Sequence, residues 1–506
     1  MIARRAARRA ALAAASGLLA ASLLACHHTP PAGTAAHAAS PTAVERLQHD
    51  IDRILSVPDL ERGYWGVVAE SLGTGETLYS RNGNKLMMPA STMKIVTLAA
   101  AARRLGWDFT YETRLVACGA VGAGVLDGDL VAIGSGDPTL DVKNAAAVFD
   151  EWADRLKAAG IHTIAGRIVG DDAAFDREAL GMGWSWDDLQ DGYAAGIGAL
   201  QFNENAARLA ISPGNAAGDA AIVGIEPETS GLTIHNQIVT AAAADAPEIR
   251  ARRQPGSSVL ELDGRVPLGA APRHQAVSVD SPARFFVQTL RAALVERGID
   301  VQGPAVALDD IKAPGDRPKV EAGRLVVSYR SPPLSVMAAA MMKTSENMYA
   351  ETLLKTLGAG DGPATIDAGR RSVEAALEEW GIDAGDMIER DGSGLSRYDY
   401  VTPGMLAAIL TRVDRDGSLR GPFESSLPIA GVDGTLANRL KGTAAEGRVR
   451  AKTGSMSNVR ALAGYVAGAG REPIVFAIIA NNFDAPPDTI NKATDAIVVA
   501  LAAFRR

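Results

Sequence analysis

Three short motifs stand far apart in this chain, and its fold must bring them together if they form one site. They are Ser91-Thr92-Met93-Lys94, Ser345-Glu346-Asn347 and Lys452-Thr453-Gly454. Ser91 and Lys94 are one helical turn apart, so their side chains can meet on one face of a helix. A serine hydroxyl becomes a strong nucleophile when a base accepts its proton, and a buried lysine with a lowered pKa can serve. The pattern indicates acyl transfer on Ser91, with Lys94 as the base.

The other two motifs suggest how such a reaction would be completed. Ser345 and Asn347 open a helical pattern, and we expect Ser345 to pass the proton to the leaving amine and Asn347 to hold the substrate amide. A helix cap with a first-turn Glu346 is the plain structural alternative, and it is compatible with these roles. Lys452 at a strand end suits a terminal carboxylate, with the Thr453 hydroxyl beside it. We expect Gly454 to let a substrate backbone approach closely, whereas an exposed edge lysine is the alternative for Lys452.

The N-terminus is typical of an exported protein. Four arginines precede an apolar stretch, which predicts a signal peptide over residues 1–25. The stretch ends in Leu23-Leu24-Ala25-Cys26, which resembles the lipoprotein box of bacteria and predicts lipidation of Cys26; an ordinary cleavage site nearby is the alternative. Residues 26–41 have the Ala, Pro and Thr content of a tether. The formal net charge of −8 argues against nucleic acid as a ligand, and any membrane contact is expected only through the lipid.

Periodicity predicts strands and helices at both ends of the chain. We expect helices from 42, over 89–104 and over 488–504, strands at 64–69, 77–79, 448–453, 460–466 and 474–480, and a turn at 454–458. Together these strands predict one antiparallel sheet built from both termini, with a mostly helical block near residues 330–415 as a second layer. Residues 110–323 instead show short strand patterns punctuated by Gly, Pro and Asp, which indicates inserted domains, with a nested piece at 207–279.

Further segments extend the pattern beyond the three motifs. They are residues 89–94 and 451–455 around the motifs, Gly-Asp-Leu at 128–130, Gly-Ser-Gly-Asp-Pro-Thr-Leu at 134–140, Gly-Trp-Ser-Trp-Asp-Asp at 183–188, Asp-Gly-Ser-Gly-Leu-Ser-Arg at 391–397 and Ala-Gly-Val-Asp-Gly-Thr-Leu at 430–436. With these segments, the chain resembles the class C low-molecular-mass penicillin-binding proteins, exported D-Ala-D-Ala carboxypeptidases and endopeptidases. A large insertion between the first and second motifs is a mark of that family.

The resemblance implies an α+β fold with a β-lactamase-like transpeptidase domain, in which helices cover both faces of a five-stranded antiparallel sheet. We place the catalytic domain at residues 42–109 and 324–506, inserted domain II at 110–206 and 280–323, and nested domain III at 207–279. It also implies a periplasmic enzyme that acts on peptidoglycan stem peptides, without a cofactor or a metal.

In the family, the motif serine is acylated by the penultimate D-alanine, terminal D-alanine leaves, and water releases the peptide. Carried over to this chain, the backbone N–H groups of Ser91 and Ser455 hold the acylated carbonyl. Penicillin is expected to acylate Ser91 as well. The resemblance further suggests a pocket for the free amine of a diaminopimelate side chain, formed by Asp188 (or Asp187), Tyr193, Arg397 and Met456. The structural alternative makes Trp184 and Trp186 core residues and Arg397 an ion-pair partner of the Asp-Gly-Ser-Gly turn.

Three other functions remain compatible with parts of the pattern. A Ser-His-Asp hydrolase would need a histidine, and outside the first 50 residues only His162, His235 and His274 occur, all in the insertion. A β-lactamase shares the three motifs but needs a group that deacylates the enzyme quickly, and none is identifiable. A non-catalytic cell-wall lipoprotein would have little reason to keep all three motifs.

Overall fold

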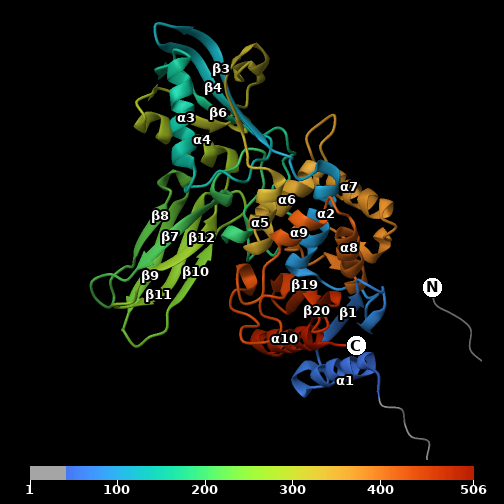
Figure 1. Ribbon diagram of the computed structural model, residues 1–506. Helices are drawn as coiled ribbons and strands as arrows, with labels where there is room; N and C mark the ends of the chain where they lie inside the picture. The colour runs from blue at the N-terminus through green and yellow to red at the C-terminus, as the bar shows by residue number, and fades with distance from the viewer. Residues whose placement is uncertain (1–40) are drawn as a thin grey trace, which may run out of the picture. The chain divides into compact units, whose positions relative to one another are not determined.

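The structure is a computed structural model that describes residues 41–506 (Figure 1). The predicted signal peptide, Cys26 and nearly all of the predicted tether lie outside the described residues. Within residues 41–506, no helix has both the length and the apolar character needed to cross a membrane.

A five-stranded antiparallel sheet combines strands from both ends of the chain, as predicted. Its strand order is β18-β19-β20-β1-β2. The strands are β1 (Tyr64–Ser71), β2 (Thr77–Arg81), β18 (Val449–Met456), β19 (Val459–Ala467) and β20 (Pro473–Asn481). The turn predicted at 454–458 is too long, because Gly454 stays in β18 and pairs with Ala461. Only Ser457 and Asn458 separate the two strands, so β18 continues past the third motif.

Helices cover both faces of this sheet because its side chains alternate between two cores. In β1, Val67 and Ala69 join one core with α1 and α10, whereas Val68 joins the other with α2 and α8. The helices of this part are α1 (Ala43–Leu55), α2 (Met93–Leu105), α5 (Leu334–Lys343), α6 (Asn347–Leu357), α7 (Ile366–Glu379), α8 (Pro403–Arg415), α9 (Arg420–Ser426) and α10 (Pro487–Ala503). A short ladder of β16 (Met387–Ile388) and β17 (Tyr400–Val401) lies between α7 and α8 in the sequence.

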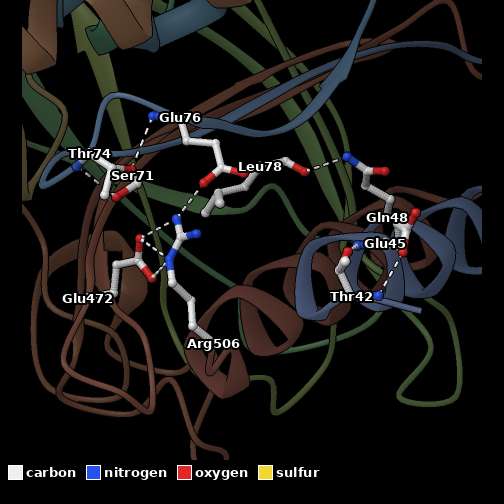
Figure 2. Close-up of polar contacts among 9 residues, drawn as sticks. All are labelled: Thr42, Glu45, Gln48, Ser71, Thr74, Glu76, Leu78, Glu472 and Arg506. Atoms are coloured by element: carbon white, nitrogen blue, oxygen red, sulfur yellow. Dashed lines mark hydrogen bonds and ion pairs between the residues drawn. The ribbon is translucent and has the colours of Figure 1, made fainter. Parts of the chain in front are cut away.

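Polar contacts fasten the two ends of the described chain to the edge of the sheet (Figure 2). Helix α1 begins with a capping box between Thr42 and Glu45, and Gln48 Nε2 donates a hydrogen bond of 3.1 Å to the Leu78 carbonyl in β2. At the other end, the Arg506 guanidinium pairs with both Glu472 and Glu76. These contacts hold α1 against β2 and the C-terminus against the residues that precede β2 and β20, on the core that does not contain the first motif.

The insertion follows α2 and contains three further sheets. Its elements are β3 (Glu112–Gly122), β4 (Val125–Ile133), α3 (Ala145–Ala158), β5 (Thr163–Ile164), β6 (Ile168–Asp171), β7 (Ala206–Ser212), β8 (Ile222–Glu226), β9 (Thr233–Ala241), β10 (Glu248–Arg252), β11 (Val259–Pro267), β12 (Arg273–Ser278), α4 (Pro282–Glu296), β13 (Asp300–Val301), β14 (Ala305–Ala307) and β15 (Arg324–Arg330). A seven-stranded sheet packs on α3 and α4, and two three-stranded sheets share a smaller core (Figure 1).

One predicted boundary of the insertion needs correction. Strand β15 was assigned to the catalytic segment that begins at residue 324, but it pairs antiparallel with β3 of the seven-stranded sheet. Its register joins Tyr329 to Thr113, so the insertion's sheet extends to Arg330. The division of the insertion into separate domains II and III stays a prediction.

A long loop between β6 and β7, residues 172–205, connects the insertion with helix α6. The fully buried Lys355 of α6 donates to Asp176 over 2.5 Å, and Gln201 donates to Thr352 over 3.0 Å. Because α6 starts at Asn347, these contacts place the loop next to the second motif.

Candidate active site

Lys94 lies at the centre of the site. Its Nζ is 3.0 Å from Ser91 Oγ, 2.6 Å from Asn347 Oδ1 and 3.0 Å from the Ser393 carbonyl oxygen. A 3-10 turn at Ala90–Thr92 leads into α2, so Ser91 and Lys94 face the same side, as their spacing predicts. Lys94 is fully buried, and burial lowers its pKa to about 8, although the charges of Asp391, Glu351 and Glu346 oppose this shift.

The contacts of Lys94 determine where a neutral amine directs its lone pair. Neutral lysine has two N–H hydrogens and one lone pair, and the Ser393 carbonyl can only accept. The Asn347 amide is oriented by the Tyr193 carbonyl, which also only accepts and lies 2.8 Å from Asn347 Nδ2. Asn347 Oδ1 therefore faces Lys94 and takes the second hydrogen. The lone pair is left for the hydroxyl proton of Ser91, which is the arrangement that a base requires.

Lys452 and Ser345 form a second buried pair. Lys452 Nζ donates to Ser345 Oγ and to the Thr453 carbonyl, each over 2.8 Å. Lys452 is fully buried, and both burial and the charge of Lys94 hold its pKa well below the ordinary lysine value. Ser345 has a φ of 69°, a strained conformation for a residue other than glycine. The Thr453 hydroxyl lies 2.7 Å from that of Thr435. Lys452 is thus not an exposed edge lysine.

Two glycines allow the backbone around Ser91 to pack tightly. A Cβ atom on Gly394 would lie 1.9 Å from the Ala90 carbonyl oxygen, and one on Gly454 would lie 2.6 Å from that of Pro89. The protein's own Pro89 carbonyl therefore occupies the space that we expected Gly454 to leave for a substrate backbone. These close approaches fix the segment that carries Ser91 between β18 and the turn at residues 391–396.

Buried carboxyl groups shape that turn. Glu351 accepts hydrogen bonds from the backbone N–H groups of Gly392 (3.1 Å) and Ser393 (2.8 Å), while burial and the neighbouring Asp391 raise its pKa to about 8. Glu389 and Asp399 are also buried, and their pKa values are raised well above the ordinary range. Because these groups favour the neutral form, the carboxyl cluster does not force Lys94 to stay protonated. Glu351 is not among the residues predicted from the sequence, although an acid in the otherwise uncharged stretch 347–354 of α6 was a usable signal.

A cavity of about 280 Å³ lies beside the two lysine–serine pairs and is lined by both serines. It is lined by the predicted residues Ser91, Asp188, Tyr193, Ser345, Asn347, Arg397, Ser455 and Met456, and by Gly394, Leu395 and Ser457, which were not singled out. Lys94 and Lys452 do not line it, but each donates a hydrogen bond to a serine that does. No histidine is among the lining residues, which leaves a Ser-His-Asp mechanism without its base.

The insertion contributes one wall of this cavity. Tyr193 Oη donates to Asp188 Oδ1 over 2.7 Å, and burial and Asp188 raise the pKa of Tyr193. Arg397 donates to the Ser457 carbonyl over 3.4 Å, and the alternative of an ion pair with the Asp-Gly-Ser-Gly turn is not seen within residues 41–506. Trp186 is 79% exposed and is not a core residue, whereas Trp184 is half-buried.

Comparison with known proteins agrees with this geometry. Residues 47–503 match the model of the D-Ala-D-Ala carboxypeptidase 3 (S13) family. A D-alanyl-D-alanine carboxypeptidase of Actinomadura sp. (strain R39) is 36% identical over 485 residues, covering 94% of this chain and 87% of the relative. A D-alanyl-D-alanine carboxypeptidase of Haemophilus influenzae is 27% identical over 423 residues, covering 83% and 85%.

Among solved structures, penicillin binding protein 4 from Haemophilus influenzae superposes with a TM-score of 0.78 at 26% identity, covering 89% of this chain and 98% of that one. The match of sequence and fold extends through the insertion as well as the catalytic sheet. The chain therefore belongs to the D-Ala-D-Ala carboxypeptidase 3 (S13) family.

Proposed function

We propose that this D-Ala-D-Ala carboxypeptidase cleaves peptidoglycan stem peptides through an acyl-enzyme on Ser91, with Lys94 as the base. The observation that carries the proposal is the 3.0 Å contact between Lys94 Nζ and Ser91 Oγ, made by a fully buried lysine whose other two partners can only accept hydrogens from it. A lysine on a solvent-exposed helix face would not be buried among hydrogen-bond acceptors in this way.

In the first step, Ser91 Oγ attacks the carbonyl carbon of the penultimate D-alanine while its proton passes to Lys94. The oxyanion lies between the backbone N–H groups of Ser91 and Ser455. The C–N bond then breaks, and Ser345 passes a proton to the leaving amine of terminal D-alanine. The proton that Lys94 took from Ser91 restores the Ser345 hydroxyl, so Lys94 is again the neutral base, and Lys452, 2.8 Å from Ser345 Oγ, holds that hydroxyl in place. A water molecule then hydrolyses the ester and restores Ser91.

Both ends of the cavity suit a stem peptide. Lys452 and Thr453 are the residues proposed to hold the terminal carboxylate, and Thr453 is half-buried. At the insertion's wall, the Asp188 carboxylate suits the ammonium group of the third residue's side chain, with Tyr193, Arg397 and Met456 around it. Endopeptidase activity on cross-linked peptides belongs to the same proposal, because cleavage of a cross-link uses the same acyl-enzyme step on Ser91.

Penicillin is expected to acylate Ser91, since the Haemophilus relative is named a penicillin binding protein. The N-terminal pattern supports a periplasmic location, with Cys26 as the lipidated residue. Mass spectrometry of the mature N-terminus tests that modification. A first residue other than a diacylated Cys26 would refute it.

Two measurements on the purified protein test the function. Fluorescent penicillin should label the native enzyme and leave Ser91→Ala unlabelled, and the native enzyme should release D-alanine from a pentapeptide. Ser335→Ala, at an intermediate-exposure serine of α5 outside the cavity, is the matched control. Absence of labelling in folded native protein would favour a non-catalytic lipoprotein. Fast multiple turnover of nitrocefin without D-alanine release would indicate a β-lactamase instead.

A further inference from the structure

The loop between β6 and β7 makes hydrogen bonds to two residues near Lys94. On one side, Trp184 Nε1 donates a hydrogen bond of 2.8 Å to Asp391 Oδ2. On the other, the Tyr193 carbonyl accepts the Asn347 amide, whose Oδ1 accepts from Lys94. Both residues belong to the loop between β6 and β7, which also carries Asp188.

The first connection passes through a fully buried carboxyl group. Asp391 is 0% exposed, and besides Trp184 it accepts the backbone N–H groups of Gly394 (2.7 Å) and Ser396 (2.6 Å). These bonds close the turn that presents the Ser393 carbonyl to Lys94. Trp184 is thus a side-chain donor to Asp391, whose other side-chain hydrogen-bond partner is the neutral carboxyl group of Asp399.

The position of the Trp184 ring is closely fitted. A Cβ atom on Gly181 would lie 2.2 Å from Trp184 Nε1, so the ring occupies space that only glycine leaves open. Gly183 has a φ of +83°, which turns the loop, and a Cβ there would lie 2.5 Å from the Tyr398 ring. Ser396 Oγ donates to the Met182 carbonyl over 2.7 Å and fixes the same loop. The indole is therefore held against Asp391 by its own loop.

We propose that Trp184 is a positioning residue through which the insertion controls the catalytic lysine. Its N–H group holds Asp391 in the turn and offsets the negative charge that Asp391 directs at Lys94. Without this donor, the carboxylate would bind the ammonium form of Lys94 more strongly, and the neutral base would become scarcer. Because the same loop forms the wall with Asp188 and Tyr193, an intact insertion is required for full reactivity of Ser91. This inference rests on the proposed role of Lys94 as the base.

The test compares Trp184→Phe with Trp186→Phe, the same substitution two residues away on a side chain that is 79% exposed. The acylation rate constant with fluorescent penicillin is measured from pH 6 to 10 for both variants and the native protein. Trp184→Phe should acylate about tenfold more slowly at pH 7, the effect of losing one hydrogen bond to a charged group. The midpoint of its pH profile should move to higher pH. Trp186→Phe should match the native protein in both respects.

The outcomes separate this inference from the proposed function. If the native protein is not acylated by penicillin, the proposed function is refuted, and with it the role of Trp184 that depends on it. If native protein is acylated and a folded Trp184→Phe keeps the native rate and midpoint, the inference is refuted. A lower rate with an unmoved midpoint also refutes it, because a purely structural loss would reduce the rate without changing the protonation of the base. Circular dichroism and thermal melting establish that each variant is folded.

Discussion

The lowered pKa of Lys94 predicts a steep pH dependence of Ser91 acylation. A lysine with the ordinary pKa of about 10.4 would be neutral in roughly 4 of 10,000 molecules at pH 7. With the pKa of Lys94 lowered to about 8 by burial, about one molecule in ten is neutral, a gain of roughly 200-fold in active base. The acylation rate should rise with pH, because neutral Lys94 is the main form above pH 8 and is lost as the pH falls below it.

Acylation should therefore rise about 90-fold between pH 6 and pH 9 and level off above that. The assay is stopped-flow labelling with fluorescent penicillin in buffers of constant ionic strength. Lys94→Ala should lower the rate at pH 7 by at least about 1,000-fold, because it removes the base without removing an apolar core residue. Lys441→Ala, at an exposed lysine, should leave the profile unchanged. A flat profile from pH 6 to 9, or a Lys94→Ala variant that labels at the native rate, would refute Lys94 as the base.

Three further substitutions test other parts of the site. Gly394→Ala places a Cβ 1.9 Å from the Ala90 carbonyl oxygen, so it should lower the free energy of unfolding in urea by about 3 kcal/mol and slow acylation. The control is Gly360→Ala, whose Cβ meets no atom within 4 Å. Equal effects of the two substitutions would contradict the packing argument. Lys355→Met leaves Asp176 without its buried cation and should lower the free energy of unfolding by about 3 kcal/mol. The control is Lys441→Met, and equal stability of the two variants would show that the Lys355–Asp176 pair does not hold the insertion. Asp188→Asn should lower kcat/KM about tenfold for a peptide with a side-chain amine at its third residue; a matching loss on a peptide without that amine would exclude recognition of the ammonium group.

The strands and helices around the motifs followed from local periodicity. Short apolar runs predicted β1, β19 and β20, and the Pro89 start signal predicted the helical segment that the structure forms as the 3-10 turn with Ser91 followed by α2 with Lys94. The predicted end of β18 was wrong, because Gly454 was interpreted as a turn residue. In the structure, glycine is needed there for the close approach of the Pro89 carbonyl. A single sequence shows that a glycine is present, but not which backbone approaches it.

Residue type and spacing alone identified Ser91, Lys94, Ser345, Asn347 and Lys452 as candidates, because the chemistry of acyl transfer needs these groups in these pairs. The tertiary structure decided what surrounds them. Burial sets the pKa of Lys94, and burial depends on segments hundreds of residues apart in the chain, such as Glu351, Ser393 and the loop with Trp184 and Tyr193. Those contacts are long-range and involve backbone carbonyl and N–H groups as often as side chains. Every residue has the same backbone groups, so no sequence pattern marks the ones that hold Lys94 in place.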